Sequence, residues 1–452
     1  MGCAPAWRVE SVDSEAVPRV QPFAALRYAP GVATDLAALI CPPYDVISDE
    51  EQAQLLAQSL YNAVALELPS DAPAEPGSRY ALAAERLAQW RRDNVLLADE
   101  RPAYYLSSTT FSHAGQTHER KDLIATIEVE PWSAGQVLPH EDTMAGPKAD
   151  RLELLRSTRL NASPIWVLYR DGLPALEQAW QTAEQREPTA AFRWRGEEHR
   201  LWRIDEPSLV NPIEATFAAG GPLYIADGHH RYETALAFRA EAEASAPGAS
   251  GTMAVLTWAQ DPGLLVLPTH RLLRGLPSEL TLEEAETRWS DVFHTEYYPV
   301  WEDAPPEQID ALMQQLASNG RTSPTFGLLG LGHLDLFAML ELRNRKAPDG
   351  RLPEDRSEAW KSLDVSLLHT LLIDPLVAEA HKPRTEVLSF TRDPQAAFKA
   401  VRQGGAEAAF FLNATPVNAV LEVSDAGDRM PEKSTYFHPK PPAGLVMRDL
   451  AQ

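Results

Sequence analysis

The stretch Leu223-Tyr-Ile-Ala-Asp-Gly-His-His-Arg-Tyr-Glu-Thr-Ala-Leu-Ala-Phe-Arg239 decides the local fold around it. Its first four residues form an apolar run of strand length, and apolar residues recur at helical spacing from Tyr232 onward. Asp227 is a good N-cap residue, and Gly228 allows another group to come close to the backbone. The stretch therefore predicts a short buried strand, a tight turn and an amphipathic helix.

The start of this helix is a candidate anion site. The free N–H groups of a helix N-terminus carry partial positive charge and favour phosphate or another anion. We expect the site to be formed by Asp227, Gly228, His229, His230 and Arg231. The alternative is that the two histidines are polar residues that merely open a helix.

A second candidate group occupies the loop before the next predicted helix. Its members are His140, Glu141, Asp142, Thr143, Lys148 and Arg151. A carboxylate beside a histidine can act as a general base, and lysine and arginine can hold phosphate oxygens. The alternative is a solvated polar loop in which Asp150 caps the helix.

Two further strings are weaker signals. Thr269, His270 and Arg271 follow a predicted strand and could reach a carboxylate or phosphate of a ligand, or they form a surface turn. Residues 429–440 mix lysines, hydroxyls and an aromatic pair. That string predicts either a loop that folds back over the site or an ordered tail.

Composition limits the classes of function. The chain has 452 residues, enough for two or three domains, and its net charge of -23 repels duplex nucleic acid. Its two cysteines, Cys3 and Cys41, give no disulfide framework and fit a reducing cytosol. No apolar run approaches the roughly 18 residues of a membrane span, and the first ten residues lack the apolar region of a signal peptide. We therefore expect a cytoplasmic protein without membrane or nucleic-acid partners.

Several common catalytic signatures are missing from the sequence. It has no Walker A loop, no kinase-type glycine-rich loop, no G-x-S-x-G elbow and no dinucleotide fingerprint. No two histidines of the candidate segments have the i, i+4 spacing of a helical zinc pair, so we predict no metal held by the protein alone. Mg²⁺ that enters with a nucleotide is the expected metal.

The periodicity predicts a mixed α+β fold. We expect a loose tail over residues 1–18, a first domain over 19–275 that carries the candidate anion site, and an α/β domain over 276–452 packed on it. The predicted helices are 48–59, 78–94, 150–159, 173–187, 280–293, 306–319, 363–376 and 394–403. The predicted strands are 103–111 and 122–130 as a hairpin, 164–169, a pair within 193–204, 252–258, 264–267, 325–330, 334–342, 386–390 and 408–412. The last two strands and the helix between them form a β-α-β pattern.

Six strings, taken in order, resemble a family known as a domain of unknown function. They are Gln21–Arg27, Pro42–Val46, His140–Thr143 with Lys148 and Asp150-Arg151, Asp227–Arg231, Pro268–Arg271 and Met430–Tyr436. Part of that family is similar to the ADP-dependent free-serine kinases, called SerK-like. Those kinases are similar in fold to the ParB N-terminal domain and to sulfiredoxin, which carry related Gly-x-x-Arg phosphate turns. The resemblance implies a ParB/sulfiredoxin-like core.

The resemblance also implies roles for the candidate residues. Glu141 looks like the base that takes a proton from the serine hydroxyl, with His140 beside it, and Asp227–Arg231 looks like the nucleotide-phosphate turn. Lys148 and Arg151 would assist at the phosphates of ADP or ATP. The residues expected at the substrate are Tyr44, Asp45, Thr143, Thr269, His270 and Arg271. Asp45 or His140 would bind Mg²⁺ or orient the base.

Two functions follow from these expectations. The first is a nucleotide-dependent kinase for a small molecule, with the hydroxyl of free L-serine as the first acceptor to test. The second is a ParB-like switch that binds and hydrolyses nucleotide without an acceptor. A redox-repair activity like that of sulfiredoxin would need a cysteine in the turn, where His229 stands. The sequence leaves open whether the chain forms a homodimer.

Overall fold

The computed structural model describes residues 19–451 except 73–74, 76, 144, 243–245, 278, 345–347 and 349, so the expected tail over 1–18 lies outside the described residues. The described chain forms two compact units. The first comprises residues up to Leu264 together with those from Pro439 onward, and the second is Leu265–His438. The domains expected from the sequence, 19–275 and 276–452, differ from these units. The observed division falls after Leu264, and the residues from Pro439 onward belong to the first unit. The C-terminal segment returns because its strand β21 (Met447–Asp449) pairs with β2 (Ala25–Tyr28) of the first unit.

The first unit is built on a nine-stranded mixed sheet. Its order is β6-β11-β8-β12-β5-β4-β10-β9, with β1 paired to β5. The strands are β1 (Val20–Gln21), β4 (Tyr104–His113), β5 (Gln116–Glu128), β6 (Val137–Leu138), β8 (Ile165–Tyr169), β9 (Ala190–Trp194), β10 (Glu197–Ile204), β11 (Leu223–Asp227) and β12 (Gly251–Trp258). A four-stranded sheet, β3-β2-β21-β7, adds β3 (Leu96–Ala98) and β7 (Leu160–Asn161). The mixed α/β class predicted from the sequence is confirmed.

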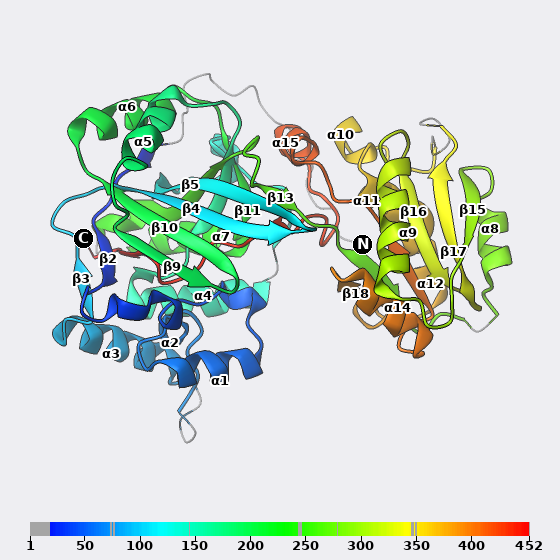
Figure 1. Ribbon diagram of the computed structural model, residues 1–452, viewed down its shortest axis with the longest axis horizontal. Coiled ribbons are helices and arrows are strands. Elements are labelled where there is room, and N and C mark those ends of the chain that lie inside the picture. The colour runs from blue at the N-terminus through cyan, green and yellow to red at the C-terminus, as the bar shows by residue number, and fades with distance from the viewer. Residues whose placement is uncertain are drawn as a thin grey trace. The chain divides into compact units, whose positions relative to one another are not determined.

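Helices follow the pattern of the sequence in most places. Those of the first unit are α1 (Asp49–Gln58), α2 (Val64–Glu67), α3 (Arg79–Arg92), α4 (Ala145–Thr158), α5 (Pro174–Ala183), α6 (Pro207–Phe217) and α7 (His229–Ala242). Short 3₁₀ turns occur at Ala33–Ala38, Tyr44–Val46, Trp132–Ala134 and Pro247–Ser250. Ser48 caps α1 by accepting the Glu51 N–H at 3.2 Å. Figure 1 shows α5 and α6 lying together beside the sheet.

The β4–β5 hairpin forms where the sequence predicts it. His113 pairs with Gln116, so only Ala114 and Gly115 make the loop, and both have positive φ, 49° and 76°. Positive φ at both central residues is the geometry of a type I′ turn, which suits the twist of two antiparallel strands.

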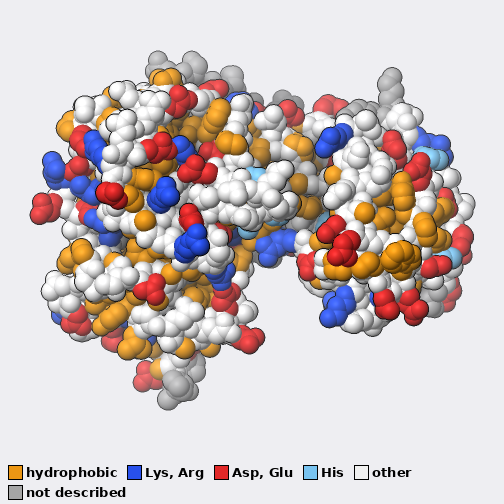
Figure 2. Space-filling model, viewed as in Figure 1, with side chains coloured by type: hydrophobic (Ala, Val, Ile, Leu, Met, Phe, Trp, Pro, Cys, Tyr) orange, Lys and Arg blue, Asp and Glu red, His pale blue; other side chains and the backbone are white. Residues whose placement is uncertain are grey.

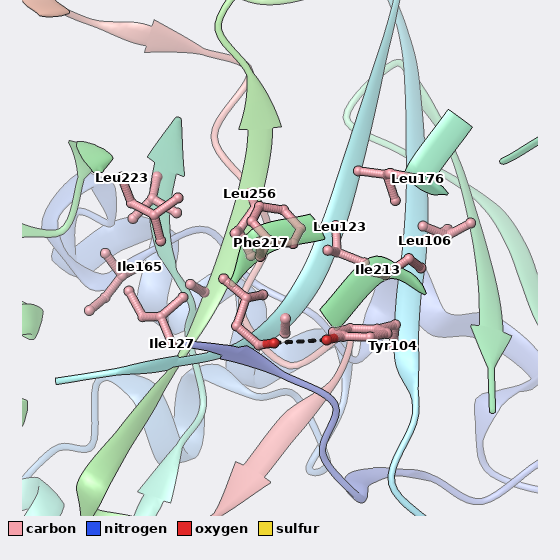
Figure 3. Close-up of a cluster of buried hydrophobic side chains, with 14 of the residues drawn as sticks. Tyr104, Leu106, Leu123, Ile127, Ile165, Leu176, Ile213, Phe217, Leu223 and Leu256 are labelled. Atoms are coloured by element: carbon pink, nitrogen blue, oxygen red, sulfur yellow. Dashed lines mark hydrogen bonds between the residues drawn. The ribbon is translucent and has the colours of Figure 1, made fainter. Parts of the chain in front are cut away.

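One apolar face of the large sheet carries the main core. Alternate residues point to this face, among them Leu106, Leu123 and Leu256 from three strands. Figure 3 shows these side chains meeting Leu176 of α5 and Phe217 of α6. The Tyr104 hydroxyl in this cluster donates to the Val20 carbonyl at 2.8 Å, which ties β1 to the core.

The second unit has a six-stranded antiparallel sheet in the order β15-β17-β16-β19-β14-β18. The strands are β14 (His270–Leu273), β15 (Phe293–Pro299), β16 (Thr325–Gly330), β17 (His333–Leu342), β18 (Leu388–Thr391) and β19 (Ala408–Phe411). The helices are α8 (Leu282–Trp289), α9 (Pro306–Asn319), α10 (Glu358–Lys361), α11 (Asp364–Leu368), α12 (Asp374–Glu379), α13 (Arg384–Val387), α14 (Pro394–Arg402) and α15 (Val417–Asp425). The expected β-α-β pattern is present, with β14 inserted between its two strands.

The predicted helix 363–376 is present, with a π-helical segment, His369–Ile373, between α11 and α12. Two other local expectations are wrong. The predicted buried strand 264–267 is a half-buried pair, β13 (Leu265–Val266), against β20 (Phe437–His438). Residues 386–387, predicted to be strand, end α13 before β18 begins.

On the face shown in Figure 2, acidic and basic side chains are interspersed. Among the described residues, no helix has the length and apolar character needed to cross a membrane.

Candidate functional site

The predicted strand, turn and helix are present as β11, Gly228 and α7. Gly228 has φ +94°, and a Cβ there would lie 3.1 Å from Nε and Nη2 of Arg231. Glycine is therefore required by the backbone and by the guanidinium packed against it. Asp227 is the last residue of the strand and not the helix cap, because its carboxylate is turned toward two cations instead.

The Asp227 carboxylate lies between Arg231 and Lys440. Arg231 Nη2 donates to Asp227 Oδ2 at 2.7 Å, while its Nη1 donates to the Pro164 carbonyl. Lys440 Nζ donates to Asp227 Oδ1 and lies 3.6 Å from Asp45 Oδ2. Burial alone would raise the pKa of Asp227, but Lys440 and Arg231 outweigh it and lower that pKa. Asp227 is therefore ionised.

The pKa values of the two cations, Lys440 and Arg231, are raised by the same contacts that lower the pKa of Asp227. Burial lowers the pKa of Lys440 and of Arg231, but Asp227 and then Asp45 reverse the effect and raise both above their ordinary values. Both side chains thus stay charged at neutral pH. Each keeps only 11% of its side-chain surface exposed.

Arg151 extends this cluster through Tyr44 and Glu67. Its guanidinium carbon lies 4.3 Å from the centre of the Tyr44 ring, and Nη1 donates to the Glu67 carbonyl at 2.5 Å. The Glu67 carboxylate accepts from the Ser163 hydroxyl at 2.7 Å and from the Tyr44 N–H at 3.4 Å. Arg151 also holds Asp150 through Nε at 2.9 Å.

His140 and His229 meet beside the turn. The His140 backbone N–H donates to His229 Nε2 at 3.2 Å, and the rings are edge to face with centres 4.7 Å apart. His140 Nδ1 lies 2.7 Å from the Ile225 carbonyl, which can only accept, so Nδ1 carries a proton. His140 Nε2 is then directed toward Glu141, whose Oε1 lies 3.7 Å away. His140 is fully buried, whereas 32% of the Glu141 side chain is exposed.

Glu233 of α7 joins the loop residues to the helix. It accepts from the Thr143 hydroxyl at 2.6 Å, from Lys148 Nζ at 2.7 Å and from the Trp132 indole N–H at 3.3 Å. Burial would raise the pKa of Glu233, but Lys148 and Thr143 lower it below the ordinary value.

The structure brings most predicted site residues into one neighbourhood of the first unit. These are Tyr44, Asp45, His140, Glu141, Thr143, Lys148, Arg151, Asp227, Gly228, His229 and Arg231, with His230 half-buried next to them. Their functional roles stay predictions.

Thr269, His270 and Arg271 belong to the interior of the second unit. Arg271 is fully buried, its Nε donates to His369 Nε2 at 3.1 Å, and its Nη2 donates to the Lys433 carbonyl at 3.1 Å. Burial and then Arg384 lower the pKa of Arg271 to about 9. The structure gives these three residues a place in the packing of their own unit, and their role at a substrate stays a prediction.

Sequence reasoning missed three members of the cluster: Glu67, Glu233 and Lys440. Lys440 ends the polar string 429–440 that the sequence marks as a loop over the site, so a signal for it existed. Glu233 follows the turn by five residues on α7, but Glu67 has no motif around it.

The cluster is nearly neutral, and no ready metal cage accompanies it. Its cations are Arg151, Arg231 and Lys440, and its carboxylates are Asp45, Glu67, Asp150 and Asp227, so the formal charges nearly cancel. Within the part of the chain that is described, no three His, Cys, Asp or Glu side chains are arranged to hold a metal ion.

Comparison with known proteins gives one clear match. The family model described as "Protein of unknown function (DUF1015)" matches residues 20–366. No curated protein sequence matches the chain significantly.

Three solved structures give weak likenesses. A free serine kinase in complex with AMP is 14% identical with a TM-score of 0.32, over 69% of this chain and 89% of that one. A conserved hypothetical protein from Pyrococcus furiosus is 12% identical, with a TM-score of 0.32, over 68% and 88% of the two chains. C-terminally truncated SbnI from Staphylococcus aureus is 10% identical, with a TM-score of 0.33, over 70% and 82%. At these TM-scores the structures assign no activity to this chain.

Proposed function

The chain belongs to the DUF1015 family of proteins of unknown function, and on that premise we propose that its first unit is a nucleotide-dependent kinase for a small molecule. The observation that carries the proposal is the neighbourhood of two groups. One is the start of α7 with Gly228, Arg231 and Lys440, and the other is the pair His140–Glu141. The first group suits phosphate oxygens and the second suits removal of a proton.

The nucleotide phosphates would lie on the N–H groups that open α7. Gly228 has positive φ and packs against the Arg231 guanidinium, so this cation lies beside the backbone that opens α7. Lys440, which contacts Asp227, and Lys148 of α4 would supply further positive charge. Charge neutralisation at the transferring phosphoryl group is the main catalytic need in such reactions.

Glu141 is the proposed base. Its exposed fraction allows a substrate hydroxyl to reach it, whereas His140 is buried and serves to position it. The hydroxyl oxygen would form a bond to the terminal phosphorus while the bond from that phosphorus to the leaving nucleotide breaks. The hydroxyl proton moves to Glu141. With ADP the leaving group is AMP, and with ATP it is ADP. Free L-serine is the first acceptor to test.

Mg²⁺ would enter with the nucleotide. The cations of the cluster already contact carboxylates, so the phosphates of ADP would leave an excess of negative charge that a divalent cation removes. Asp45 is the suitable protein ligand, because 42% of its side chain is exposed and it lies at the edge of the cluster. Asp227 has both oxygens engaged by Arg231 and Lys440. When bound, the ion would neutralise phosphate charge.

The test is transfer by the full-length protein. Mg²⁺ with ADP or ATP, with and without L-serine, is followed by ³¹P NMR for O-phosphoserine and the released nucleotide. Glu141→Gln should lower the transfer rate by a factor on the order of 100 or more, with nucleotide affinity nearly unchanged. Glu153→Gln on the exposed face of α4 is the matched control. Full activity in Glu141→Gln would refute the assignment, and hydrolysis indifferent to amino acids would favour the ParB-like switch.

A further inference from the structure

A second pocket of the first unit lies at the other end of β8 from the α7 cluster. Its volume is about 740 Å³, within the range of small-molecule sites. Asp227 pairs with Trp166 near the start of β8, whereas Tyr169, the last residue of that strand, lines the pocket. The pocket is therefore separate from the proposed nucleotide site.

The pocket extends the core face of the sheet. Side chains two residues apart on a strand share a face. Val167 and Leu256 lie in the core, and two residues further along each strand come Tyr169 and Trp258, which are strand partners. Both line the pocket, and α5 closes it with Trp180. Aromatic rings thus replace the aliphatic side chains at the point where the core opens to solvent.

These rings are held in place before any ligand binds. The Trp258 indole N–H donates to the Arg170 carbonyl at 3.0 Å. The Tyr169 ring meets Phe217 edge to face with centres 5.6 Å apart, and Trp180 meets Trp202 in the same way at 5.7 Å. A site with fixed rings loses little freedom when it binds a ligand.

Carboxylates face the same space. Asp261 accepts from the Gly263 N–H at 2.8 Å and from the Lys121 N–H at 3.3 Å. Within the described residues, neither Asp261 nor Glu177 forms an ion pair, although both line the pocket. Burial and then the charges of Asp261, Asp122 and Glu177 raise the pKa of Tyr169 above its ordinary value.

The Asp261 carboxylate is costly without a cation. Burial and then Asp122 raise its pKa to about 6, against a smaller opposite effect of the backbone N–H groups and Arg120. Lys121 is the one lysine or arginine that lines the pocket, and it pairs with Glu184 instead. Its Nζ lies 5.2 Å from the centre of the Trp180 ring, which shows that a cation is accommodated on these aromatic walls.

We propose that this pocket binds an organic cation, an amine or quaternary ammonium group on an apolar body. Aromatic faces attract such cations, and the attraction grows when water is excluded. The cation would rest against Trp258 and Tyr169, and Asp261 with Glu177 would supply the countercharge. The apolar body would lie along Leu173 and Leu176 of the same wall.

The test uses choline and its neutral carbon isostere, 3,3-dimethylbutan-1-ol, titrated calorimetrically into the full-length protein. The two probes have nearly the same shape, so the difference in affinity isolates the charge. We expect choline to bind at least tenfold more tightly. Trp258→Leu and Asp261→Asn should each weaken choline binding at least tenfold, and the exposed Asp93→Asn should not.

The affinity should also depend on pH. The titratable and charged groups around Asp261 lie on three elements: His118, Glu119, Arg120, Lys121 and Asp122 of β5, Tyr169 of β8 and Glu177 of α5. Because a carboxylate holds a cation only when ionised, choline affinity should rise between pH 5 and pH 7 in the wild type. The rise should be reduced in Asp261→Asn.

Three results would overturn the proposal. The first is equal affinity for choline and its isostere, which would show a merely apolar pocket. The second is choline binding that both substitutions leave unchanged, which would place it elsewhere. The third is no binding of choline up to millimolar concentration.

Discussion

Asp261 should make the protein less stable as it ionises, and Asp261→Asn should remove this effect. The pKa of Asp261 rises from an ordinary 3.8 to about 6 in the folded chain, so folding binds a proton between these values. An acid with a raised pKa in the folded state destabilises it increasingly as pH rises through that window. The shift of about 2 pKa units corresponds to about 3 kcal/mol above pH 7.

The magnitude at accessible pH values follows from the same relation. At pH 4.5 the penalty is about 1 kcal/mol, and at pH 8 it is close to 3 kcal/mol. The asparagine side chain still has an oxygen that can accept from the Gly263 N–H, but its NH2 group cannot accept from the Lys121 N–H. Loss of that hydrogen bond lowers the free energy of unfolding by about 1 kcal/mol at either pH. Asp261→Asn should therefore be near neutral at pH 4.5 and stabilising by about 2 kcal/mol at pH 8.

The assay is urea unfolding of wild type and variant at both pH values, followed by tryptophan fluorescence. Only the difference between the two pH values is needed, since a hydrogen bond lost at both cancels. Asp93→Asn controls for the removal of one carboxylate, with an expected change within about 0.5 kcal/mol. A variant that is destabilised equally at pH 4.5 and pH 8 would refute the reasoning.

Three further predictions concern buried charges and the turn. Gly228→Ala should destabilise the first unit by about 1–3 kcal/mol in thermal unfolding, because φ is +94° and the new Cβ would meet Arg231; unchanged stability would show that the turn relaxes. Lys440→Met should lower the free energy of unfolding by about 3 kcal/mol or more, because Asp227 is left with one cation. Adding Asp227→Asn to the same chain should restore part of that stability, and a double-mutant cycle measures how much. Arg271→Lys should destabilise the second unit by about 2–4 kcal/mol in urea unfolding, because lysine cannot serve the same set of acceptors; a change below about 0.5 kcal/mol would contradict this.

Local signals in the sequence predicted much of the fold. The apolar run before Asp227, the glycine after it and the helical spacing that follows are all short-range features, and β11, Gly228 and α7 are present as expected. The hairpin around Ala114 and Gly115 has the same origin. Both depend on residues that contact their sequence neighbours.

Other elements depend on packing that no local pattern reveals. The helix α6 begins with Pro207 and contains Pro212, so its sequence is typical of a loop. It is nevertheless a helix, because Ile213 and Phe217 pack in the core of the first unit. Asp227 has the properties of a helix cap, but its carboxylate instead accepts from Lys440, more than two hundred positions away in the sequence. The pairing was hidden because it joins distant parts of the chain.

The candidate site shows the same division. Residues within the loop and turn strings could be named from the sequence, whereas Glu67 enters through a contact with Ser163 that no motif announces. The pocket of Trp180, Trp258 and Asp261 had no sequence signal, because Trp180 of α5 is far along the chain from the end of β12, where the other two lie.

The central claim is that the start of α7 holds nucleotide phosphates. Calorimetric titration of Mg²⁺-ADP into wild type and into the double variant Asp227→Asn with Lys440→Met tests it most directly. The double variant removes the Lys440 cation together with the Asp227 carboxylate that it contacts, and thermal unfolding of both proteins checks that they are folded. We predict one saturable site in the wild type and affinity at least tenfold weaker in the double variant. Equal affinity in the two proteins, or no binding of nucleotide by the wild type, would contradict the account.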